Sequence, residues 1–253
     1  MRHFFILLRH EVRVLLISPA TYIAAVLFLG VMGFFFQELL ANYAAEPSDV
    51  SPAVGFFRLF FFPVFFLTPL LTMRSLAEER RLGTIETLMT TPVTSLVVVL
   101  SKFTAAYLYY LALWLSTLSF HYVLYRFAAN PQVIDPGPLL GGYLFVALSG
   151  LMFIATGIFA SAMTRSQLVA GLLSFALTIL LTLGLRKLAD LTLFITRPGD
   201  LVDAVAAHVQ IFQHADDFVS GVFDTRAPVF YLSMTALLLF LSVLALDARS
   251  ARS

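Results

Sequence analysis

Side chains that support catalysis are scarce in this sequence and match no catalytic pattern. There are no cysteines, which excludes thiol catalysis, disulfides and cysteine-bound metals. The two lysines, Lys102 and Lys187, do not end the glycine-rich Gly-Lys-Ser/Thr run that binds ATP phosphates. We therefore expect a chain that is not an enzyme, has no cofactor of its own and does not bind ATP through that loop.

Histidine and serine spacing leads to the same expectation. His208 and His214 are six residues apart and do not form the His-Glu-x-x-His zinc motif, so no metal site is predicted. Ser149-Gly150 falls one residue short of the Gly-x-Ser-Gly motif of intramembrane serine proteases, and the later apolar segments offer no histidine base. Small residues at this place favour close helix packing instead.

The composition indicates an all-α polytopic membrane protein. Of 253 residues, 60% are hydrophobic and only 12% are charged, against about 25% charged in a soluble domain. The apolar runs approach the ~20 residues that a membrane-spanning helix needs and exceed the length of barrel strands. The net charge of +1 argues against nucleic-acid binding.

Charge-free stretches predict one membrane domain over residues 1–253 with six spans. Arg58 must reach the interface for the second span to be long enough. Ionisable side chains are expected at span ends rather than at span centres, which disfavours an ion-coupled carrier. The predicted spans are approximately 18–40, 54–73, 97–124, 138–162, 167–187 and 228–247.

The N-terminal segment, residues 1–17, is predicted to form an amphipathic helix in the membrane interface. Phe5, Leu8 and Val12 fall on one helical face, and the cations Arg2, Arg9 and Arg13 fall on another. A plain basic tail is the alternative. With six spans, the side that carries both termini has a net charge of +5 and the other side −4, which together give the chain's +1. The excess of Lys and Arg predicts cytoplasmic termini.

The segment between the second and third spans is predicted to contain two short helices. Ser75 and Glu78 have capping-box spacing, so a charged helix is expected to run to Leu82, and Gly83 would end it with a positive φ. Thr84 would cap a second helix with an apolar stripe. A connector needs only a few residues, so we interpret this segment as a docking surface rather than a re-entrant loop. The stripe consists of Ile85, Leu88 and Met89.

This segment resembles the hallmark of ABC-2 type transporter permeases, the membrane subunits of a class of ATP-binding-cassette transporters. Within that class, the chain is most similar to the gliding-motility-type permease, through segments 70–74, 77–79, 161–167, 218–224 and 231–232. The hallmark is carried by Glu79, Gly83, Thr84, Glu86, Leu88 and Pro92.

The resemblance implies that an ATPase on a separate polypeptide, which binds ATP and Mg, drives a membrane dimer in the bacterial inner membrane. Glu79 and Glu86 are expected to make polar contacts with that ATPase, and apolar docking is expected from the stripe. The second membrane subunit would be another copy or an auxiliary protein with a large external domain. The expected coupling residues are Arg74, Glu78, Glu79, Arg80, Arg81, Gly83, Thr84, Glu86, Leu88, Met89 and Pro92.

The external segment 188–226 is predicted to contain an amphipathic helix that begins after Asp200 and includes Phe212. It would lie on the outer surface of the membrane or pack back onto the bundle. Asp216 and Asp217 lack the spacing of an EF-hand calcium loop. The predicted function is ATP-driven export or envelope-directed work, and the alternative is a non-transporting membrane scaffold that anchors a partner.

Overall fold

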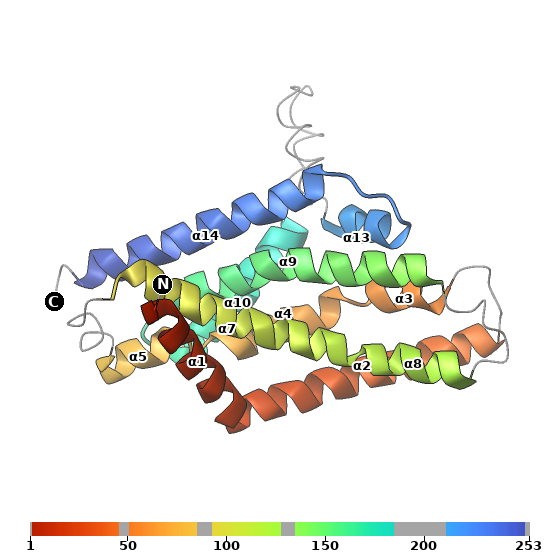
Figure 1. Ribbon diagram of the computed structural model, residues 1–253, viewed down its shortest axis with the longest axis horizontal. Helices are drawn as coiled ribbons and strands as arrows, with labels where there is room; N and C mark the ends of the chain where they lie inside the picture. Colours follow the sequence, from red (N-terminus) through yellow and green to blue (C-terminus); the bar gives the residue numbers. More distant parts are fainter. Residues whose placement is uncertain (1, 46–50, 85–92, 128–134, 185–210, 251–253) are drawn as a thin grey trace.

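The computed structural model describes residues 2–45, 51–84, 93–127, 135–184 and 211–250, and these residues are helical with short connections. Figure 1 shows the long helices running side by side along one axis, with both chain ends at the same end of the bundle. Each long helix is apolar enough to cross a membrane. They are α2 (Pro19–Ala45), α7 (Ser95–Ser116) continued by α8 (Leu118–Phe127), α9 (Pro136–Met163) and α14 (Arg226–Ser250).

The second predicted span, 54–73, is a broken helix. It consists of α3 (Pro52–Arg58) and α4 (Phe61–Thr72), with a bend of 48° at the break. Pro63 explains the break, because it lacks an N–H and its ring crowds the carbonyl four residues earlier, that of Leu59. The Leu59 carbonyl accepts from the Phe62 N–H instead, at 3.3 Å.

The fifth predicted span, 167–187, is shorter than expected within the described residues. It comprises α10 (Gln167–Ile179) and the π-helical turn η2 (Leu180–Gly184), and residues 185–187 lie outside the described part. The described residues therefore hold four long spans, or five with the bent pair, plus this shorter apolar helix. A multi-pass membrane protein is confirmed, whereas the count of six spans is not.

Helix α9 lies at the centre of the bundle: 72% of its most apolar stretch is buried, against 22% for α2. A Cβ built on Gly150 would come within 2.2 Å of the Tyr110 ring, and one on Gly157 within 2.1 Å of Thr72. Only glycine therefore allows α7 and α4 to approach α9 so closely. The Ser149 hydroxyl donates to the Phe145 carbonyl of its own helix at 2.7 Å. Close packing at Ser149-Gly150 is confirmed.

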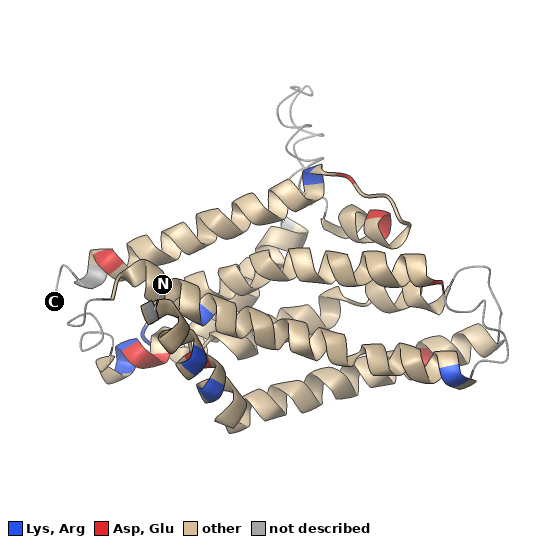
Figure 2. Cartoon of the chain, viewed as in Figure 1, with Lys and Arg blue, Asp and Glu red and all other residues tan. Residues whose placement is uncertain are grey.

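Two shorter helices cover the bundle. The N-terminal segment is helical as α1 (Arg2–Ile17), which packs against α7 and crosses the long axis in Figure 1. Its place in the membrane interface stays a prediction. Helix α13 (Ile211–Val219) packs back onto α3 and α9, and buries Ile211 and Phe218. The predicted helix start at Asp200 lies outside the described residues. Figure 2 shows charged ribbon segments gathered at the α5 end, at the opposite end and where α14 begins, whereas most of the length of the long helices is uncharged.

Candidate functional site around helix α5

The short charged helix predicted after the second span is present as α5 (Ala77–Leu82). The predicted capping box of Ser75 and Glu78 is wrong, because no side chain within the loop caps α5. The N–H groups of Leu76 and Ala77 both donate to the Ser161 hydroxyl of α9, at 3.0 Å. A residue 85 positions away in the chain thus satisfies donors that a helix start leaves open.

The end of α5 agrees with the prediction. Gly83 has φ +72°, and its N–H donates back to the carbonyls of Arg80 and Glu79. The Thr84 hydroxyl donates to the Glu79 carbonyl at 3.2 Å, so Thr84 helps to close α5. The predicted second helix, with Glu86, Leu88, Met89 and Pro92, lies outside the described residues.

Arg80 connects α5 to the ends of two long helices. Its guanidinium donates to the Ala162 carbonyl in the last turn of α9 and to the Ala245 carbonyl of α14, the latter at 3.0 Å. Carbonyls in the last turn of a helix lack intrahelical partners and carry partial negative charge. The planar, forked guanidinium can donate in two directions at once, which fixes α5 against both helices.

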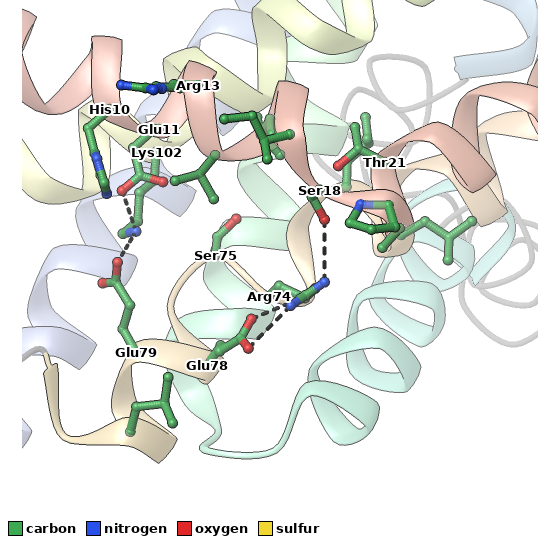
Figure 3. Close-up of a pocket in the computed structure, with 18 residues that line it drawn as sticks. His10, Glu11, Arg13, Ser18, Thr21, Arg74, Ser75, Glu78, Glu79 and Lys102 are labelled. Carbon is green, nitrogen blue, oxygen red and sulfur yellow. Dashed lines mark hydrogen bonds and ion pairs between the residues drawn. The ribbon is translucent and has the colours of Figure 1, made fainter.

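A buried ion cluster joins α5 to two further helices. The Lys102 ammonium of α7 lies 2.6 Å from Glu79 Oε1 of α5 and 2.7 Å from Glu11 Oε1 of α1. The Lys102 side chain is only 3% exposed. Figure 3 shows the three side chains converging from their separate helices. Sequence spacing placed Lys102 at a span end and gave no sign that it pairs with Glu11.

Two adjacent carboxylates in α5 have opposite electrostatic environments. Burial raises the pKa of Glu79, the Lys102 ammonium opposes this rise, and the Glu11 carboxylate adds to it. Hydrogen bonds from the Arg74 guanidinium lower the pKa of Glu78, with contacts at 2.8 and 3.3 Å. Arg74 also donates to Ser18, at the junction of α1 and α2, at 3.4 Å.

These contacts surround a cavity of about 750 Å³. The cavity lies between the α1–α2 corner and the α4–α5 segment, and polar side chains from both sides point into it (Figure 3). Arg13 of α1 lines it, whereas Arg9 does not. Of the predicted interfacial cations, Arg9 and Arg13 are exposed on α1, and the side chain of Arg2 lies outside the described part.

The two sides of α5 differ in their surroundings. The inner face of α5 is connected to α1, α7, α9 and α14 through Glu79, Ser161 and Arg80. Its outer face presents Arg81, whose side chain is 59% exposed. Leu82 is 62% exposed and also lines the cavity. Of the predicted coupling residues, the structure brings Arg74, Glu78 and Glu79 to one cavity, directs Arg80 to the ends of α9 and α14, and leaves Arg81 at the surface.

Part of the chain matches a known protein family. A family model described as ABC-2 family transporter protein matches residues 37–186, more than half of the chain. The matched region includes α5, Lys102 and Ser161. Among curated proteins, no significant match was found.

Proposed function

Because the chain belongs to the ABC-2 family of transporter proteins, it is a membrane subunit of a transporter, and we propose that an ATPase on a separate polypeptide drives it through α5. ATP and Mg are held by that ATPase. The membrane domain crosses the bacterial inner membrane six times with both termini in the cytoplasm. Both ends of the chain lie at the α5 end of the bundle in Figure 1, which supports an even number of spans, and the excess of Lys and Arg on that side supports a cytoplasmic location.

The observation that carries the proposal is the two-sided character of α5. Four of its six residues are charged, so α5 lies outside the hydrocarbon region. One side bonds to the ends of spanning helices, and the other exposes Arg81 and Leu82. A surface connector would not need three separate polar attachments to the bundle. We infer that the ATPase binds the exposed side together with the predicted contacts of Glu86, Leu88 and Met89.

The proposed mechanism follows the contacts of the inner face. When the ATPase closes on ATP, it displaces α5. Arg80 transmits the displacement to α9 and α14, and Glu79 transmits it through Lys102 to α7. The Arg74–Glu78 pair transmits it to the α1–α2 corner. The long helices then separate from those of a second membrane subunit, which opens a path for export or applies force to the envelope.

The second subunit is another copy of this chain or an auxiliary membrane protein with a large external domain. We also propose that the chain belongs to the gliding-motility subtype. Two segments of that resemblance occupy structured positions: segment 161–167 contributes Ser161 to the start of α5, and segment 218–224 begins in the last two residues of α13.

The proposal is tested by co-purifying the partner ATPase with the chain, reconstituting the two and measuring permease-dependent ATP hydrolysis. Arg81→Glu reverses an exposed charge on α5 and should reduce this stimulation about tenfold, as loss of about 1.4 kcal/mol of binding would. Arg126→Glu, an exposed cation on α8, is the matched control and should stay within twofold. Unchanged stimulation in Arg81→Glu would refute contact through α5. An ATPase that binds without any stimulation would favour the scaffold alternative.

A further inference from the structure

Two neighbouring hollows lie along α2 and α4. The first is the cavity beside α5 (Figure 3), which combines charged side chains with apolar ones such as Ile17 and Leu71. The second is a groove of about 290 Å³ between α2 and α4 that is lined only by apolar residues, from Ala24 to Val31 on α2. Leu70 lines both, so the polar cavity adjoins the apolar groove.

The groove has the position and length for part of an acyl chain. From Ala24 to Val31, α2 rises about 10 Å at ~1.5 Å per residue. Leu27 and Phe66 line the groove and are 55% and 51% exposed, so they face the bilayer. The cavity lies at the end of the groove where α2 begins, at Pro19, and the start of a spanning helix is expected near the headgroups. A polar cavity at the end of an apolar groove matches the shape of a membrane lipid.

The charges in the cavity specify the headgroup. Arg74 is paired with Glu78, and Lys102 with Glu11 and Glu79. Among the described residues, Arg13 has no ion-pair partner, so it is available to an anion such as a phosphate.

The second group that lacks a partner is the carboxylate of Glu79. Its Oε2 atom is enclosed and has no hydrogen-bond partner within the described structure. A buried carboxylate oxygen requires a donor, and Glu79 itself lines the cavity. A primary ammonium has the N–H groups to satisfy it, whereas a quaternary ammonium has none.

We infer that the cavity and groove bind one zwitterionic phospholipid of the phosphatidylethanolamine type, from the leaflet on the α5 side. Its phosphate lies against Arg13, its ammonium donates to Glu79, and one acyl chain occupies the groove between α2 and α4. The lipid is a resident component of the joint around α5 rather than the transported molecule. This inference is independent of the ATPase proposed above.

The test is native mass spectrometry of the delipidated full-length protein with dioleoyl phosphatidylethanolamine, phosphatidylcholine and phosphatidylglycerol at equal mole fractions. The ethanolamine lipid should be retained about fivefold more than either other lipid, the ratio for about 1 kcal/mol from one charged contact. Free phosphoethanolamine at equal concentration should not displace it, because it has no acyl chain for the groove. Equal retention of the three lipids, or displacement by the free headgroup, would overturn the inference.

Variants locate the site. Arg13→Gln should reduce retention of the ethanolamine lipid about fivefold. Arg9→Gln, an exposed cation on the same helix that does not line the cavity, should not change it. Leu27→Trp fills the groove and should abolish the lipid adduct, whereas Ile23→Trp, exposed on α2 outside the groove, should retain it. Equal losses in a variant and its control would place the lipid elsewhere and refute the assignment.

Discussion

The two ends of the bundle are held together by different interactions. At the α5 end, charged and hydroxyl side chains connect five helices, with Lys102 between Glu11 and Glu79. At the opposite end, aromatic rings do the same work: Phe56 packs edge-on against His121 at 4.8 Å and against Phe57 at 5.3 Å between ring centroids. Both clusters are buried, so the difference lies in the chemistry of the contacts.

The comparison indicates which end moves. Aromatic packing has no exchangeable partner and rearranges only when the whole interface opens. An ion cluster with two carboxylates and one ammonium has alternatives, because either carboxylate can leave while the ammonium stays paired. We therefore expect the α5 end to have two arrangements and the aromatic end to act as the fixed end. The following variants test this contrast.

The largest effect is expected at the aromatic end. Phe56 is fully buried, and Phe56→Ala should lower the free energy of unfolding by about 3 kcal/mol. This value is near the lower end for Phe→Ala substitutions in protein cores, because a side chain inside the membrane loses its packing contacts but gains no exposure to water. Phe34→Ala, on a ring that is 64% exposed, is the control and should change it by less than about 0.5 kcal/mol. Unfolding in mixed micelles measures both, and a salt-dependent loss in Phe56→Ala would contradict the apolar assignment.

The next largest effect is expected at the ion cluster. Lys102→Met leaves two carboxylates without their cation and should lower the free energy of unfolding by about 2 kcal/mol. The loss is smaller than for a fully buried ion pair, because the Glu79 side chain is partly exposed. Adding Glu79→Gln removes one of those charges and should restore part of the stability. The same unfolding assay applies, and a double variant less stable than Lys102→Met would show that the carboxylates do not repel one another there.

Arg80→Lys should lower the free energy of unfolding by about 1 kcal/mol. Lysine keeps the charge but cannot donate in two directions, so one of the two bonds to the Ala162 and Ala245 carbonyls is lost. Arg81→Lys is the matched control, since Arg81 is exposed and makes only a 3.9 Å contact with Glu78. Equal stabilities of the two variants would mean that Arg80 does not hold α9 and α14 together.

The smallest effects are pH dependences of opposite sign in adjacent residues. The pKa of Glu79 is raised above its ordinary 4.5, so its contribution to stability is greatest below pH 4.5 and is lost as pH rises through the raised value. The pKa of Glu78 is lowered, so its contribution is present above pH 4.5 and is lost as pH falls through the lowered value.

Melting temperature against pH separates the two. Glu79→Gln should remove a decline toward higher pH, and Glu78→Gln should remove a decline toward lower pH. Each variant is the control for the other, since they differ by one position on the same helix. Identical changes in the two profiles would contradict the opposite environments of these carboxylates.

Local signals predicted most of the helices, whereas the contacts around α5 required the tertiary structure. Gly83 ends α5 because the local chain needs a positive φ, and residue type alone reveals that. The start of α5 was not predictable in the same way, since its donors bond to Ser161 rather than to Ser75. The break before α4 had a local cause in Pro63, which an apolar run of this length conceals.

The ion cluster shows the same limit. Glu11, Glu79 and Lys102 are far apart in the sequence, and charge counting assigned each of them to the same membrane side without pairing them. Spacing along a chain does not specify which elements meet. A lysine within an apolar helix is a signal nonetheless, because such a side chain requires a partner when buried.

Distances between spin labels test most directly whether ATP-driven movement is concentrated at the α5 end of the bundle. The chain has no cysteine, so introduced cysteines carry the labels without background. One pair, Phe5→Cys with Leu82→Cys, spans α1 and α5; the other, Tyr122→Cys with Leu140→Cys, spans α8 and α9, and all four positions are well exposed. With the partner ATPase, ATP should change the first distance by at least about 2 Å, the scale of helix shifts in switching proteins, and leave the second unchanged. A larger change at the α8–α9 pair, or no change at the α1–α5 pair, would contradict the account.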